Sequence, residues 1–150
     1  MSTETITDRI IAVDYDMSLQ DVISVGNYDH AYPGITQEKF PVEGRGTKKF
    51  RTKLFKFGRK ISSKNAVARM KAENFTPGGH VHGIAYGATF PEEQREHGIS
   101  CLGSSAQVRS NLSVVCLSGD SHWRSVELQG WDDVWDSDWR FLGVQEVSGA

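Results

Sequence analysis

Residues 123–144 read WRSVELQGWDDVWDSDWRFLGV, and this stretch decides how the fold is interpreted. Its flanks, 123–129 and 139–147, are rich in β-branched and aromatic residues, which is typical of strands. Between them, residues 130–139 contain three of the chain's four tryptophans and four aspartates. Because tryptophan is usually buried and aspartate is usually exposed, this short segment must reach both environments.

The three tryptophans are spaced four residues apart, at Trp131, Trp135 and Trp139. That spacing would form one face of a helix, but aspartate and serine are poor helix formers and favour turns. We therefore predict a structured loop with tryptophan anchors pointing inward and aspartates pointing outward. Rigid aromatic residues framing short polar groups are typical of recognition surfaces. The alternative is a structural loop with core tryptophans and no ligand.

The neighbouring segments predict an α+β domain. After Gly98 come short strand-like runs, "ISCLGS", "LSVVCLS", "WRSVELQ" and "WRFLGVQEV". Runs of strands that follow helices, instead of alternating with them, indicate a mainly antiparallel sheet. Earlier segments predict a strand at 5–15, a short helix at 18–26, turns at 27–46, a strand at 47–57 with a bulge near Leu54–Phe55, and a helix at 62–75.

Two helices have recognisable start signals. Ser18 is followed three residues later by Asp21, and Ser62 or Ser63 precedes the 62–75 segment, in which Val67 and Met70 are expected to face inward.

The segment 78–97 is ambiguous. "GIAYGATF" can form a glycine-weakened helix, and "PEEQREH" predicts a helical turn beginning at Pro91.

Composition bounds the class of protein. A chain of 150 residues with 38% hydrophobic and 24% charged residues is expected to form one globular domain. No apolar run is long enough to span a bilayer. The N-terminus lacks the pattern of a Sec-type signal, so we expect a cytoplasmic location. Cys101 and Cys116 lie in apolar runs and are expected to be buried free thiols.

Charge is unevenly distributed along the chain. Residues 44–72 contain eleven Lys or Arg and no acid, so the remainder carries −13 against an overall −2. Such a cluster can bind a polyanion, including weak nonspecific binding of nucleic acid. Two alternatives are a solvated strand face and pairing with the acidic remainder. The candidate cations are Lys49, Arg51, Lys53, Arg59 and Lys60.

The motif GGHVHG places His80 and His82 two residues apart. On a strand both rings would share a face and could bind a metal, whereas on a helix they would diverge. We interpret the segment as helix or loop with exposed histidines, and predict no metal site and no cofactor. No GxSxG elbow, P-loop or CxxC motif is present, so an enzyme is not favoured. A metal-dependent enzyme using these histidines is the third hypothesis.

The segments "FPEEQREHGISCLGS" (90–104) and "LSVVCL…WRSVELQGWDDVWDSDWRFLGV" (112–144) resemble small bacterial proteins that end in a Trp-rich variable stretch followed by Arg-Phe-Leu-x-Val. They also resemble the C-terminal part of C-type-lectin-like domains, the fold used by variable proteins of diversity-generating retroelements. The resemblance covers roughly residues 47 to 147. It implies a C-type-lectin-like domain at 47–150 whose first and last strands pair, preceded by an N-terminal addition at 1–46.

In that family, replacement of template adenines varies Asn codons of the AAC type, giving Asp, Ser, His, Arg and Val among others, but not Trp, Glu or Gln. The accessible types here are Asp120, Ser121, His122, Arg124, Ser125, Val126, Asp132, Asp133, Val134, Asp136, Ser137 and Asp138. The inaccessible ones, which the resemblance makes framework, are Trp123, Glu127, Gln129, Trp131 and Trp135.

The chain also departs from the family. "PGGHVHGIAYG" replaces a more regular Leu- and Glu-rich helix, and no Glu-Pro-Asn or Gln-Pro-Asp motif is present for lectin-style calcium binding. The first hypothesis is therefore a non-catalytic module that binds a protein or small ligand. Its predicted surface comprises Asp120, Ser121, His122, Trp123, Arg124, Trp131, Asp132, Asp133, Trp135, Asp136 and Asp138. The second hypothesis is nucleic-acid binding by residues 45–71.

Overall fold

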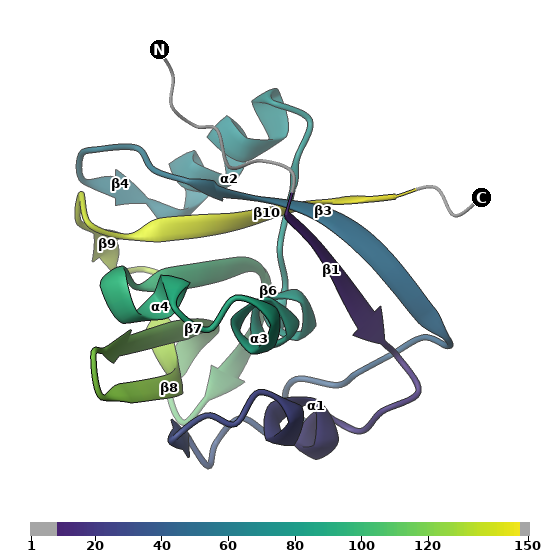
Figure 1. The fold of residues 1–150 in the computed structure, drawn as a ribbon. Helices are drawn as coiled ribbons and strands as arrows, with labels where there is room; N and C mark the ends of the chain where they lie inside the picture. The colour runs from purple at the N-terminus through teal and green to yellow at the C-terminus, as the bar shows by residue number, and fades with distance from the viewer. Residues whose placement is uncertain (1–8, 148–150) are drawn as a thin grey trace.

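The computed structural model describes residues 9–147. The helices are α1 (Leu19–Val25), α2 (Ser63–Ala72), α3 (His80–Thr89) and α4 (Glu93–Glu96). The strands are β1 (Arg9–Asp14), β2 (His30–Ala31), β3 (Thr47–Phe55), β4 (Ile61–Ser62), β5 (Thr76–Pro77), β6 (Ile99–Val108), β7 (Asn111–Asp120), β8 (Trp123–Gly130), β9 (Val134–Trp135) and β10 (Arg140–Glu146). The predicted α+β class is confirmed (Figure 1).

The main sheet has eight strands in the order β1-β3-β10-β6-β7-β8-β2, with β5 also pairing β10. β3 and β10 are antiparallel and meet near the centre, where Phe55 pairs Phe141 and Leu54 pairs Leu142 in continuous register. The bulge predicted near Leu54–Phe55 is therefore wrong. The irregularity lies in β6 instead, between Cys101 and Ala106.

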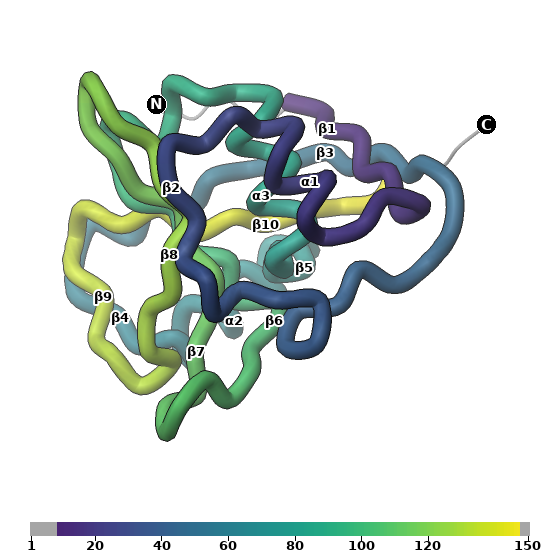
Figure 2. Tube along the Cα trace, turned by 90° about the horizontal axis from the view of Figure 1, so that it is seen from below, coloured from purple at the N-terminus to yellow at the C-terminus, as the bar shows by residue number. Residues whose placement is uncertain are grey.

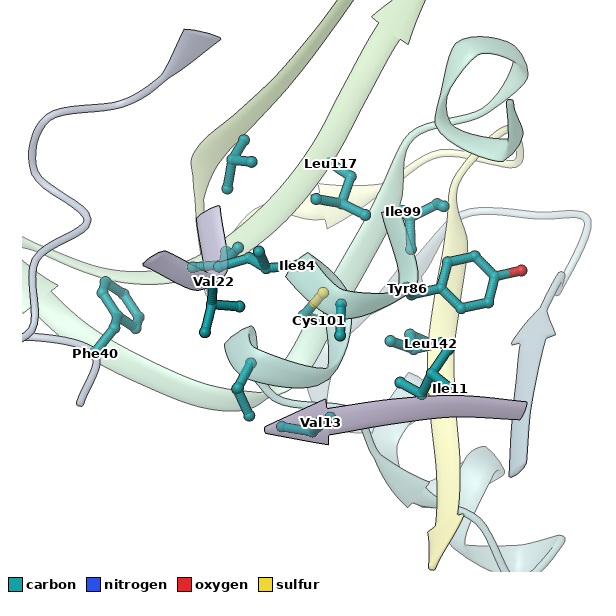
Figure 3. Packing of buried hydrophobic residues seen from close by; sticks show 14 of the residues in the cluster. Ile11, Val13, Val22, Phe40, Ile84, Tyr86, Ile99, Cys101, Leu117 and Leu142 are labelled. Carbon is teal, nitrogen blue, oxygen red and sulfur yellow. The ribbon is translucent and has the colours of Figure 1, made fainter. Parts of the chain in front are cut away.

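The central strands are buried on both faces because alternate residues enter two different cores. Leu142 joins a cluster beneath α1 and α3, and its neighbour Phe141 joins a second cluster against α2, β4 and β9. Figure 3 shows Ile84 and Tyr86 of α3 in the first cluster, packed among strand residues that include Ile11 and Leu117. The arrangement holds β9 and its flanking segments against the second core.

The predicted helix caps at Ser18 and Ser62 are confirmed. The Ser18 hydroxyl accepts the Asp21 backbone N–H, and the Ser62 hydroxyl accepts that of Asn65. In α2, Met70 is fully buried and Val67 is partly buried. Met70 therefore anchors the predicted inward face of the helix.

Helix α3 contains two glycines because two neighbours approach its backbone closely. A Cβ atom at Gly83 would overlap the Cys101 sulfur, and one at Gly87 would overlap the Tyr28 hydroxyl. Close packing thus selects glycine despite its cost of about 1 kcal/mol in a helix. The expected buried thiols are confirmed, and burial raises the pKa of Cys101 to about 12.

Residues 9–46 contribute to both edges of the main sheet. β1 pairs β3 at one edge, whereas β2 runs parallel to β8 at the other (Figure 2). Between them, α1 packs against α3. The segment that precedes β1 lies outside the described residues. No helix in the described part of the chain is long and apolar enough to cross a membrane.

Candidate functional site: the two ends of β8

The Asp loop, residues 131–138, is held in place through its backbone. Its central residues form β9, which pairs antiparallel with β4. Beneath it, the Trp135 indole N–H donates to the Ser63 hydroxyl at 2.9 Å, and that hydroxyl donates to the Trp131 carbonyl at 2.7 Å. A buried serine on α2 therefore ties together two positions of the loop.

Trp135 is the principal anchor of the Asp loop. It is 1% exposed and packs edge-to-face on Trp139 at 4.7 Å between ring centroids and on Phe141 at 5.8 Å. Trp131 and Trp139 are only partly buried. The prediction of tryptophan anchors is thus confirmed most fully at Trp135, whose burial is at the same time a correction to the predicted binding surface.

The four aspartates of the loop all point outward, as predicted: Asp132, Asp133, Asp136 and Asp138 are exposed. Their hydrogen bonds are local. Asp136 accepts the Asp138 backbone N–H at 2.9 Å, and Asp133 accepts the Gln129 side-chain amide at 3.0 Å. Within residues 9–147, no ion pair joins these carboxylates to a lysine or arginine. The loop therefore presents oriented negative charge to solvent.

A polar cleft of about 290 Å³ opens beside the Asp loop. This volume lies at the small end for ligand pockets and suits one side chain or a small polar molecule. Its walls come from the start of β7, the end of β8 and the loop: Asn111, Leu112, Ser113, Leu128, Gln129, Gly130, Asp132 and Asp133. Only the two aspartates were candidates from sequence. The other lining residues come together through the pairing of β7 with β8, in which Ser113 lies opposite Gly130.

The structure divides the predicted recognition surface in two. The hairpin tip, residues 120–123, lies where β7 turns into β8, and the Asp loop follows the opposite end of β8. The seven strand residues 124–130 separate them by roughly 23 Å. Asp120, Ser121, His122 and Trp123 are all exposed. The two groups therefore do not form one contiguous binding site.

Arg124 is a correction to the predicted surface, because it is only 4% exposed. Its guanidinium donates to the carbonyls of Gly26 and Gly87 and to the Gln94 side chain, and it lies over the Tyr28 ring at 4.5 Å. Gly87 is in the last turn of α3, where the helix dipole favours a cation. Arg124 thus fastens three segments together. Ser125 and Val126 are buried too and belong to the same framework.

The expectation of exposed histidines in a glycine-rich turn is wrong. His80 and His82 lie in the first turn of α3, and His80 is 8% exposed. The His80 ring bridges the Ser104 hydroxyl at 2.8 Å and the Pro41 carbonyl at 2.9 Å. Since the carbonyl can only accept, Nε2 carries the proton and Nδ1 accepts from Ser104. Both ring nitrogens are therefore committed to structure.

His82 is held by one ring nitrogen, since its Nδ1 accepts the Gly79 backbone N–H at 2.9 Å. Burial lowers the pKa of His82 to about 4, with a smaller contribution from His80. Across residues 9–147, no group of three or more His, Cys, Asp or Glu residues could hold a metal. The described residues thus offer the metal-enzyme hypothesis no ligand set.

The candidate cations fall into two groups. Lys49, Arg51 and Lys53 lie on β3, and Lys53 is committed to Glu73 at 2.7 Å. Arg59 and Lys60 lie beyond the end of β3, directly before β4, and are exposed. Because Ile61 pairs with Trp135 and Ser62 with Val134, Arg59 and Lys60 lead directly into the strand that pairs with the Asp loop. Part of the basic stretch thus lies beside the Asp loop and does not extend the cations of β3.

No protein-family model matches this chain, and no curated protein or solved structure matches it significantly.

Proposed function

We propose that the protein is a non-catalytic binding module whose recognition surface is the Asp loop together with the adjoining cleft. The observation that carries this proposal is the separation of roles within eight consecutive residues. Trp135 is buried and hydrogen-bonded to Ser63, whereas the four aspartates face solvent and make no ion pair within the described chain. A fixed backbone whose exposed carboxylates make only local hydrogen bonds and no ion pair suits recognition, because little conformational freedom is lost on binding.

We further propose that the scaffold is a C-type-lectin-like domain of the kind used as variable proteins by diversity-generating retroelements. Two features support this proposal: the pairing of β3 with β10, the first and last strands of residues 47–147, and the Trp-rich loop directly before Arg140. Sequencing the flanking DNA tests it. A near-repeat of the 3′ coding end beside a reverse-transcriptase gene is the expected finding. The absence of both features from the flanking DNA would contradict the assignment.

Panning against a random-sequence peptide library displayed on phage tests the recognition surface. The comparison uses wild type, the double variant Asp132→Ser/Asp136→Ser, and the control Glu38→Ser/Glu43→Ser, which removes two exposed acids from another segment. Clones enriched on wild type should bind the control equally and lose binding to the Asp132/Asp136 variant. Equal binding to all three proteins, with unchanged thermal unfolding, would place recognition elsewhere.

A further inference from the structure

The hairpin tip carries a tryptophan that is exposed and yet held in position. Trp123 is 46% exposed and is the first residue of β8, where it pairs with Asp120 across the hairpin. Its ring stacks on that of His30, which precedes Ala31 in the edge strand β2, with 6.3 Å between centroids and 21° between planes. A large aromatic side chain fixed at the surface is the residue type that most often dominates binding energy at interfaces.

Two carboxylates next to Trp123 are also fixed, each by one oxygen. Asp120 Oδ1 accepts the His122 backbone N–H at 2.8 Å, and Asp29 Oδ2 accepts the Arg124 backbone N–H at 2.8 Å. Among residues 9–147, the second oxygen of each carboxylate makes no hydrogen bond or ion pair. Both acids are exposed. They are therefore oriented acceptors that flank an aromatic ring.

The nearby arginines do not occupy this surface. Arg124 is buried and directs its guanidinium to carbonyls on the inner side. Arg95 donates to the Asp120 backbone carbonyl at 3.1 Å and pairs with Glu92 at 3.3 Å, so its charge is already compensated. The hairpin tip and its neighbour Asp29 thus keep two unpaired negative charges beside the Trp123–His30 stack.

We propose that the hairpin tip, with Asp29 and His30, is a docking surface for an arginine side chain of a partner protein. A guanidinium is planar, stacks on aromatic rings, and offers a fork of N–H donors that fits carboxylate oxygens. Trp is the aromatic residue with the strongest attraction for a cation. Lysine is less suited because its ammonium is compact and strongly hydrated. The proposal is independent of the Asp loop, which lies at the other end of β8.

Nuclear magnetic resonance on the full chain tests this docking surface. The probe is the blocked tripeptide acetyl-Gly-Arg-Gly-amide, compared with its Lys counterpart, in buffer of physiological ionic strength. We expect a saturable shift of the Trp123 indole N–H resonance with a Kd in the range of about 1 mM. The Lys peptide should bind about tenfold more weakly, because it lacks the stacking plane.

Matched variants separate this surface from the Asp loop. Asp29→Asn/Asp120→Asn keeps a side-chain oxygen for each backbone N–H but removes both charges, and it should abolish the shift. Asp132→Asn/Asp133→Asn removes two charges at the other end of β8 and should leave it unchanged. Three results would overturn the proposal: no Trp123 shift with wild type, equal binding of the Lys peptide, or a shift that survives in Asp29→Asn/Asp120→Asn. The phage experiment on the Asp loop is unaffected by any of them.

Discussion

The two ends of β8 present similar surfaces on opposite kinds of anchor. At the Asp loop, exposed aspartates lie above Trp135, an uncharged ring in an apolar cluster. At the hairpin tip, the exposed residues Asp120, His122 and Trp123 adjoin Arg124. This buried cation donates its hydrogen bonds mainly to backbone carbonyls. This difference teaches that a residue that is usually exposed, such as arginine, can belong to the buried framework when the fold supplies hydrogen-bond acceptors for it. Five measurements test this comparison.

Trp135→Ala should have the largest effect. It removes a fully buried aromatic side chain from the second core and breaks the bond to Ser63, so we expect a loss of about 3–5 kcal/mol in the free energy of unfolding. Urea denaturation followed by circular dichroism measures it. A loss below about 1 kcal/mol would show that the Asp loop does not depend on its tryptophan.

Arg124→Met should follow closely, at about 2–4 kcal/mol. It keeps much of the side-chain length but leaves the Gly26 and Gly87 carbonyls without their donor, and buried unsatisfied groups cost about 1–3 kcal/mol each. Relief of the buried charge offsets part of that loss. The same denaturation experiment applies. Stability equal to wild type would mean that an apolar anchor serves both ends of β8 equally well.

Acid sensitivity of the fold should come from α3, where His82 is partly buried. Because the pKa of His82 is lowered to about 4 in the folded protein, the unfolded chain, with a pKa near 6.5, binds the proton first. The contribution of neutral His82 to the free energy of unfolding should be fully present above about pH 6.5. The free energy of unfolding should then fall by at most about 3 kcal/mol as pH decreases to about 4. His82→Gln should flatten this slope in urea titrations at several pH values. An unchanged slope would assign the acid sensitivity to other groups.

Ser63→Ala should lower the free energy of unfolding by about 1–2 kcal/mol. It removes the hydroxyl that bridges the Trp135 indole and the Trp131 carbonyl, while both groups remain shielded from water. The Trp131 backbone would then exchange amide hydrogen faster, as measured by hydrogen–deuterium exchange. The hairpin tip is the internal reference and should exchange as in wild type. Faster exchange at both ends of β8 would indicate that they do not open independently.

The smallest effects should come from the exposed aspartates. Asp132→Ser, Asp133→Ser, Asp136→Ser and Asp138→Ser should each change stability by about 0.5 kcal/mol or less, as surface substitutions usually do. Thermal melts of the four variants measure this. If they unfold the domain while Trp135→Ala does not, the Asp loop is a structural polar network and its role as a recognition surface fails.

Sequence reasoning succeeded where the signal was local. The Ser18 and Ser62 caps act within one turn of their own helices, and the inward tryptophans and outward aspartates follow from the large difference in hydration between these side chains. It failed at the cleft, because Asn111 and Gln129 are brought together only by β7–β8 pairing. It also joined the hairpin tip to the Asp loop, since nearness along the chain conceals the length of an intervening strand.

By itself, the sequence determined the α+β class, the caps, the buried thiols and the two-sided character of the Asp loop. Each depends on side-chain polarity and contacts within a few residues. Only the tertiary structure decided that Arg124 and His80 are internal, because their acceptors come from Gly26, Gly87 and Pro41, distant in the chain. A polar side chain becomes buried when the fold supplies partners for its hydrogen bonds, and no property of the residue or its neighbours reveals those partners.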